Sequence, residues 1–135
     1  MRGAVLLALV LFALTTCASL QAGTSSTTAL RVSYWEDSAK ARPDVVRTLE
    51  CDPARGTIAR PARACARLDA GGARLFAPVS PKAVCTEIYG GPQKARIVGT
   101  VAGKRVWATF TRANGCHIER WNRLVPWLLP PGGVT

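Results

Sequence analysis

Apolar and polar residues alternate along several short stretches of this chain, as they do in strands that bury one face. In the first stretch, Leu30, Val32 and Tyr34 alternate with more polar positions. The dipeptide Ala102-Gly103 separates the last two stretches and favours a hairpin between them. The pattern predicts four strands, over Leu30–Trp35, Val45–Cys51, Ala95–Val101 and Lys104–Thr111.

Between the second and third predicted strands the pattern changes. Pro61–Asp69 starts with proline, contains alanines and precedes two glycines, which predicts a helix. Pro78–Pro92 holds three prolines around Cys85–Tyr89 and favours a stiff, exposed loop. The tail, His117–Leu129, predicts a short helix or loop followed by an apolar strand. Together these elements predict an α+β domain with a mostly antiparallel sheet.

The first 22 residues have the layout of a secretory signal peptide. Met1-Arg2-Gly3 carries positive charge, Ala4–Leu14 is a continuous apolar run, and small residues follow. The run is too short to span a bilayer comfortably, so an uncleaved signal anchor is the less favoured alternative. Cleavage can follow Ala18 or Ala22, and we prefer Ala22.

The predicted boundaries follow from that cleavage. Residues 23–29 form a flexible leader, residues 30–129 the folded domain and residues 130–135 a frayed tail. A lipoprotein signal at Cys17 is a weaker alternative, because Thr16 is bulkier than the residue usual before a lipidated cysteine. Either way we expect a secreted, extracellular protein whose mature chain is not stably inserted in a membrane.

Charge narrows the choice of partners. Eighteen Lys and Arg residues against eight Asp and Glu residues give a net charge of +10, which favours anionic surfaces. Arg63 and Arg67 lie four residues apart on the predicted helix. We interpret them as part of a solvated basic face and expect no nucleic-acid partner, because the tryptophans lie far away in sequence.

Trp121 and Trp127 could mark an interfacial tail, but Pro126 opposes a membrane helix, so the tail should pack against the sheet.

The residues needed for catalysis are missing. The chain has one histidine, His117, no Gly-x-Ser-x-Gly motif and no phosphate-binding glycine loop. Its eight carboxylates are scattered along the chain. We therefore expect no catalytic residue, no metal site and no cofactor, and we do not expect an enzyme.

Four cysteines remain beyond Cys17, and an even number in a small exported domain predicts two disulfides. Their spacing alone leaves three pairings open. Zinc binding competes with disulfide formation, but no Cys-x-x-Cys pair is present. The four are Cys51, Cys65, Cys85 and Cys116.

Several motifs that surround these cysteines point to one family when they are taken together. They are Cys51-Asp52-Pro53, Ala64-Cys65-Ala66, Cys85-Thr86-Glu87-Ile88-Tyr89, and Asn114-Gly115-Cys116. From about Leu30 to Cys116 the chain resembles the subtilisin inhibitor-like family, which consists of secreted bacterial inhibitors of serine proteases.

The resemblance implies a five-stranded antiparallel sheet with two short helices, a homodimer joined through the sheets, and an extracellular serine protease as partner. It also implies the disulfides Cys51–Cys65 and Cys85–Cys116. The inhibitory loop would begin at Cys85, and the reactive bond would be Glu87–Ile88. Thr86 and Tyr89 would flank that bond.

The chain departs from the family at the residue that enters the protease's specificity pocket. That residue is commonly basic or Met, whereas this chain has Glu87. We therefore expect either a glutamate-preferring target or weakened action on subtilisin-like and trypsin-like enzymes. After Tyr89, the pair Gly90-Gly91 is expected to add flexibility. The alternative function is a non-inhibitory, secreted, basic binding protein on the same scaffold.

Overall fold

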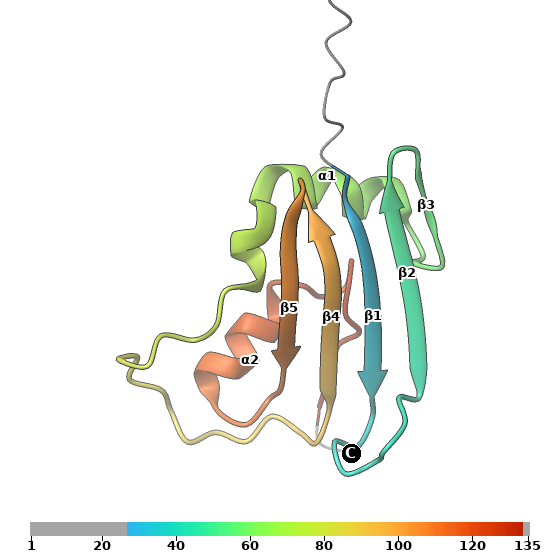
Figure 1. Cartoon of the computed structure of the whole chain (residues 1–135). Coiled ribbons are helices and arrows are strands. Elements are labelled where there is room, and N and C mark those ends of the chain that lie inside the picture. Colours follow the sequence, from blue (N-terminus) through green and yellow to red (C-terminus); the bar gives the residue numbers. More distant parts are fainter. Residues whose placement is uncertain (1–26, 134–135) are drawn as a thin grey trace, which may run out of the picture.

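The computed structural model describes residues 27–133, so the predicted signal peptide, Cys17 and most of the leader lie outside the described residues. In Figure 1 one sheet faces the viewer and the helices lie behind it. The strands are antiparallel, in the order β3-β2-β1-β4-β5. They are β1 (Ala29–Trp35), β2 (Val45–Cys51), β3 (Ala54–Gly56), β4 (Lys94–Val101) and β5 (Lys104–Phe110). The helices are α1 (Pro61–Gly71), the 3-10 helix η1 (Gly72–Phe76) and α2 (Gly115–Asn122).

This architecture confirms the predicted fold class: a five-stranded antiparallel sheet, two α-helices and two disulfides. The core lies between the sheet and the helices. Val32 on β1 lies directly opposite Ile97 on β4, and both are almost fully buried. Trp121 of α2 is completely buried against the same layer. Burying each such side chain stabilises the fold by roughly 1.5–3 kcal/mol.

The predicted helix is confirmed as α1. Pro61 occupies its first turn, where the missing N–H costs nothing, and Gly72 follows its last residue. The helix buries Ala64, Cys65 and Leu68. The disulfide Cys51–Cys65 joins the buried side of α1 to the end of β2, which fixes the helix on the sheet.

The hairpin between β4 and β5 is also confirmed. Val101 pairs with Lys104, so the loop has two residues, and both Ala102 and Gly103 have positive φ. That geometry matches the twist of the flanking strands. The sequence did not predict β3, because three exposed residues carry no alternation and only their pairing with β2 defines the strand.

One prediction about the tail is wrong. No apolar strand follows α2 within residues 27–133; the chain instead continues in turns. Leu128 N–H donates to the carbonyl of Leu124, a helical spacing, and Pro126 has no N–H to give to a strand ladder. Trp121, Leu124 and Leu128 are each at most 1% exposed, so the prediction that the tail packs against the sheet is confirmed.

Candidate functional site

The segment between Phe76 and Lys94 contains no helix or strand and runs along one side of the molecule, beside α2 (Figure 1). Its middle is open to solvent: Val84 is fully exposed, Ile88 is 63% exposed and Tyr89 is 58% exposed. Glu87 is exposed as well. The sequence prediction of a long exposed loop is confirmed, and we call residues 77–93 the exposed loop.

The exposed loop is fixed next to Glu87 by two bonds to the start of α2. The disulfide Cys85–Cys116 is the first, and it is the pairing that the family resemblance implies. In the second, the N–H of Gly115 donates to the carbonyl of Thr86 at 3.0 Å. A Cβ atom at Gly115 would collide with Oγ1 of Thr86, so a larger residue there would force the Thr86 side chain to rotate away. The backbone immediately before Glu87 is therefore held.

A buried arginine fixes the other end of the exposed residues. Arg112 is 8% exposed. Its Nε donates to the carbonyl of Gly90 at 2.8 Å, while the N–H of Gly90 donates to the carbonyl of Arg112 at 2.8 Å. Its Nη1 also donates to Oδ1 of Asn122, and the guanidinium lies over the ring of Trp121. Hydrogen bonds from charged donors are typically worth about 1.5–3 kcal/mol.

The expectation that Gly90 and Gly91 loosen the exposed loop is not met. Gly90 is held by its two bonds to Arg112 and packs so closely that a Cβ atom would lie 2.6 Å from Cγ1 of Ile118. Gly91 is buried and has a φ of +120°, a conformation that other residues rarely adopt. These glycines allow close packing at the end of the loop.

A second buried arginine holds the beginning of the loop. Arg120, one turn after Cys116 on α2, is 8% exposed. Its guanidinium donates to the carbonyls of Ala77 at 2.7 Å, Phe76 at 3.0 Å and Thr109 at 2.6 Å, and it stacks on Phe110. Burial lowers the pKa of Arg120, because removal from water disfavours its charged form. The three backbone carbonyls replace the water that would otherwise accept hydrogen bonds from this guanidinium.

Sequence reasoning found the exposed stretch of the loop but missed Arg112 and Arg120. From the sequence, Arg63 and Arg67 are interpreted as part of a solvated basic face, and no role is assigned to Arg112 or Arg120. A usable signal was present for Arg120, since a residue four positions after Cys116 in a helix shares its face and therefore also points toward the loop.

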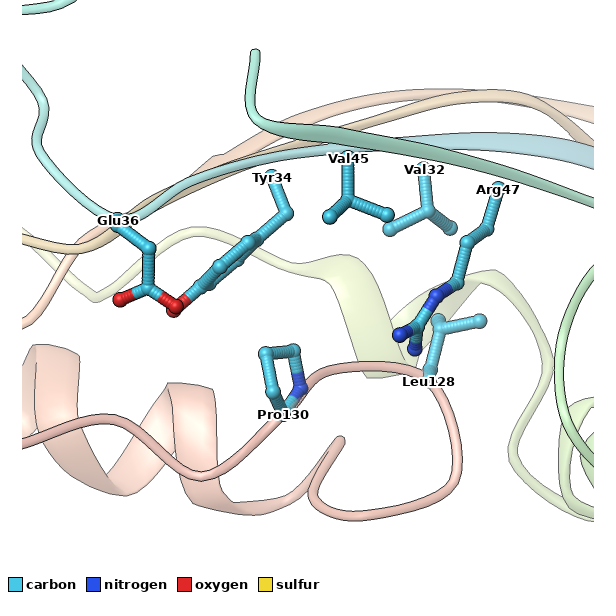
Figure 2. A pocket seen from close by; sticks show the side chains of 7 residues that line it. All are labelled: Val32, Tyr34, Glu36, Val45, Arg47, Leu128 and Pro130. Atoms are coloured by element: carbon cyan, nitrogen blue, oxygen red, sulfur yellow. The ribbon is translucent and has the colours of Figure 1, made fainter.

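His117 and a hollow beside the sheet show no catalytic arrangement. The Nδ1 atom of His117 lies 2.9 Å from the amide oxygen of Asn114, the residue that caps α2. Figure 2 shows the hollow, about 140 Å³, with the Tyr34 ring directed toward Glu36 at one end. Burial, together with the hydrogen bond to Glu36, raises the pKa of Tyr34. This volume is below that of typical ligand pockets.

Among residues 27–133, no three His, Cys, Asp or Glu side chains are grouped so that they could hold a metal ion. In the same range no helix combines the length and apolar character required to cross a membrane.

Comparison with known proteins identifies the family. Residues 14–114 match the profile of the subtilisin inhibitor-like family, and the chain belongs to that family. A structure of Streptomyces caespitosus sermetstatin in complex with Bacillus licheniformis subtilisin contains a chain 29% identical to this one, with a TM-score of 0.48. The match covers 70% of this chain and 90% of that chain. A comparison with curated proteins finds no match.

We predict that Arg112→Met loosens the exposed loop without unfolding the domain. The substitution removes the side-chain bonds to Gly90 and Asn122, so stability should fall by about 1–3 kcal/mol and the Gly90 amide should exchange faster with solvent. Hydrogen exchange followed by NMR measures both effects. Arg123→Met is the matched control, because Arg123 is an exposed arginine whose side chain bonds to Glu119 of α2. Equal exchange at Gly90 in the two variants would contradict the prediction.

Proposed function

We propose that this protein inhibits a serine endopeptidase by presenting residues 85–89 as a substrate-like segment, with Glu87–Ile88 as the reactive bond. Membership of the subtilisin inhibitor-like family supports serine-protease inhibition in general. The observation that supports this particular reactive bond is that the backbone is anchored on both sides of it. Thr86 is fixed one residue before Glu87, and Gly90 is fixed two residues after Ile88.

Anchoring on both sides favours tight binding. A protease binds its substrate as an extended segment with one side chain in the specificity pocket. A free peptide loses conformational entropy when it adopts that shape, whereas an anchored loop has already lost most of it. The side chains of Glu87 and Ile88 remain exposed and free to contact the protease.

The same anchors oppose release after cleavage. If the protease cuts the Glu87–Ile88 bond, Cys85–Cys116 retains the acyl side and the Arg112–Gly90 pair retains the amine side. The new amino group of Ile88 then stays beside the acyl-enzyme. Proximity favours resynthesis of the bond over hydrolysis by water. The proposed role needs no catalytic residue or cofactor from this chain.

Glu87 determines the proposed target. A carboxylate that enters an apolar or acidic specificity pocket loses its water without gaining a partner, which costs several kcal/mol. A cationic or strongly hydrogen-bonding pocket avoids that cost. We therefore propose a glutamate-preferring serine endopeptidase as the preferred partner and weaker action on subtilisin-like or trypsin-like enzymes.

We place the encounter outside the cell. The two disulfides fit an oxidising compartment. The intact mass of the protein recovered from culture medium should correspond to a chain that starts at Gly23. A recovered mass that includes residues 1–22 would contradict export with cleavage after Ala22.

The open face of the sheet supports a proposed homodimer. Trp107, on the outer face of β5, is 74% exposed and lies beside Val98 of β4. The guanidinium of Arg96, a residue of the neighbouring strand β4, stacks on the Trp107 ring. A second copy of the sheet is a self-complementary partner, because both copies present the same open sheet face with the same exposed tryptophan.

For the homodimer we predict that Trp107→Glu shifts the protein from dimer to monomer in sedimentation equilibrium, because a carboxylate replaces the largest apolar contact. Val84→Glu introduces the same charge at a fully exposed loop position and should leave the dimer intact. A wild-type protein that sediments as a monomer at 100 µM, about the range of weak dimers, would contradict the proposal.

For the target we predict that wild-type protein titrates a glutamyl endopeptidase stoichiometrically and that Glu87→Lys transfers the preference to trypsin. In the complex with trypsin, the substitution removes a carboxylate that would be buried without a partner in the specificity pocket and supplies a lysine that the pocket pairs with. It should tighten trypsin inhibition more than about a hundredfold. Glu119→Lys is the control, since it changes net charge equally from an exposed position on α2. No stoichiometric inhibition of glutamyl endopeptidase, trypsin or subtilisin by the wild type would overturn the proposed function and favour the non-inhibitory alternative.

A further inference from the structure

A groove of about 210 Å³ lies at the junction of β2, the start of α1 and the C-terminal tail. Four of its lining side chains are arginines, and the others are apolar. The lining residues are Arg47, Arg60, Arg63 and Arg67, with Ile58, Ala59, Pro126 and Trp127. We call this the arginine groove.

No carboxylate lines the arginine groove. The salt bridges found in residues 27–133 lie elsewhere and engage other cations: Lys40 with Asp44, Arg55 with Glu50, and Arg123 with Glu119. Four like charges are thus gathered in one hollow without a counter-charge from the protein. Their mutual repulsion opposes folding, and an anion from solution would relieve it.

Arg47 occupies a position where the sheet would ordinarily carry an apolar residue. It lies opposite Val32, on the same side of β2 as Leu49, and both of these neighbours are buried. The side chain therefore starts from the core-facing side of the sheet and, as a half-buried residue, lies between the hollow of Figure 2 and the arginine groove and lines both. A purely solvated basic face would not require a charge at this register position.

The rest of the groove favours phosphate over nucleic-acid bases. The Arg67 guanidinium lies 5.8 Å from the centre of the Trp127 ring, but Trp127 is only 8% exposed and offers no open face for a base to stack on. Guanidinium groups match phosphate oxygens in a bidentate geometry. The first turn of α1 contains no acidic residue, so nothing there offsets the arginines.

We propose that the arginine groove binds consecutive phosphate groups of an anionic polymer and so attaches the protein to a polyanionic matrix. The groove lies at the β2–β3 side of the sheet, whereas residues 85–89 lie beside α2 at the β5 side (Figure 1). A polymer in the groove therefore leaves the reactive loop free. The proposal does not depend on the proposed protease inhibition.

The experiment measures binding of the mature protein to long-chain inorganic polyphosphate by titration at several salt concentrations. The double variant Arg60→Gln/Arg63→Gln should weaken binding about tenfold or more and lower the slope of log Kd against log salt by roughly 1.4–1.8, as expected for two lost phosphate contacts. The control Arg42→Gln/Arg74→Gln removes the same charge from exposed positions outside the groove and should weaken binding less than about twofold.

Equal loss in the two double variants would overturn the proposal, because the overall positive charge of the protein would then account for binding. Tighter binding of single-stranded DNA than of polyphosphate with the same number of phosphates would overturn the choice of partner. The protease titration of Arg60→Gln/Arg63→Gln should match that of the wild type. Loss of polyphosphate binding with unchanged inhibition separates this proposal from the preceding one.

Discussion

The shape of the exposed loop depends on residues 112–120, which lie beside it and bond to it. Residues 77–93 form no helix or strand, so no regular ladder of backbone hydrogen bonds holds their shape. Ordering such a segment costs about 1–2 kcal/mol per residue. Arg112, Gly115, Cys116 and Arg120 offset part of that cost with two guanidinium groups, one amide and one disulfide. Because α2 carries most of these groups, the packing of α2 on the core sets the position of the loop.

The sheet and α1 were predictable because local signals agree with the tertiary structure. The alternation along β1 places Leu30, Val32 and Tyr34 in the core, and proline and glycine mark the two ends of α1. The loop was predictable for a different reason: closely spaced prolines around a cysteine disfavour both regular elements. The choice of Glu87–Ile88 within that loop came from family motifs, since no periodicity distinguishes one exposed bond from its neighbours.

The remaining features depend on contacts between segments that are distant in sequence. Arg112 and Arg120 resemble surface charges until the carbonyls of Gly90, Phe76 and Ala77 are placed beside them. The tail was assigned a strand from its apolar content. The spacing of Trp121, Leu124 and Leu128 indicated turns of helical pitch, and Pro126 already disfavoured a strand. In the tail, the spacing of the apolar residues predicts the structure better than their number does.

The bonds that hold the loop have a consequence for diversification. Arg112 and Arg120 donate to main-chain oxygens, and the Gly115 amide does the same. Apart from the cysteine and the glycines, these contacts are indifferent to which side chains the loop displays. The side chains at positions 87–89 can therefore be exchanged without changing these contacts. One substitution at position 87 would then change which protease the proposed loop fits, both in evolution and in protein engineering.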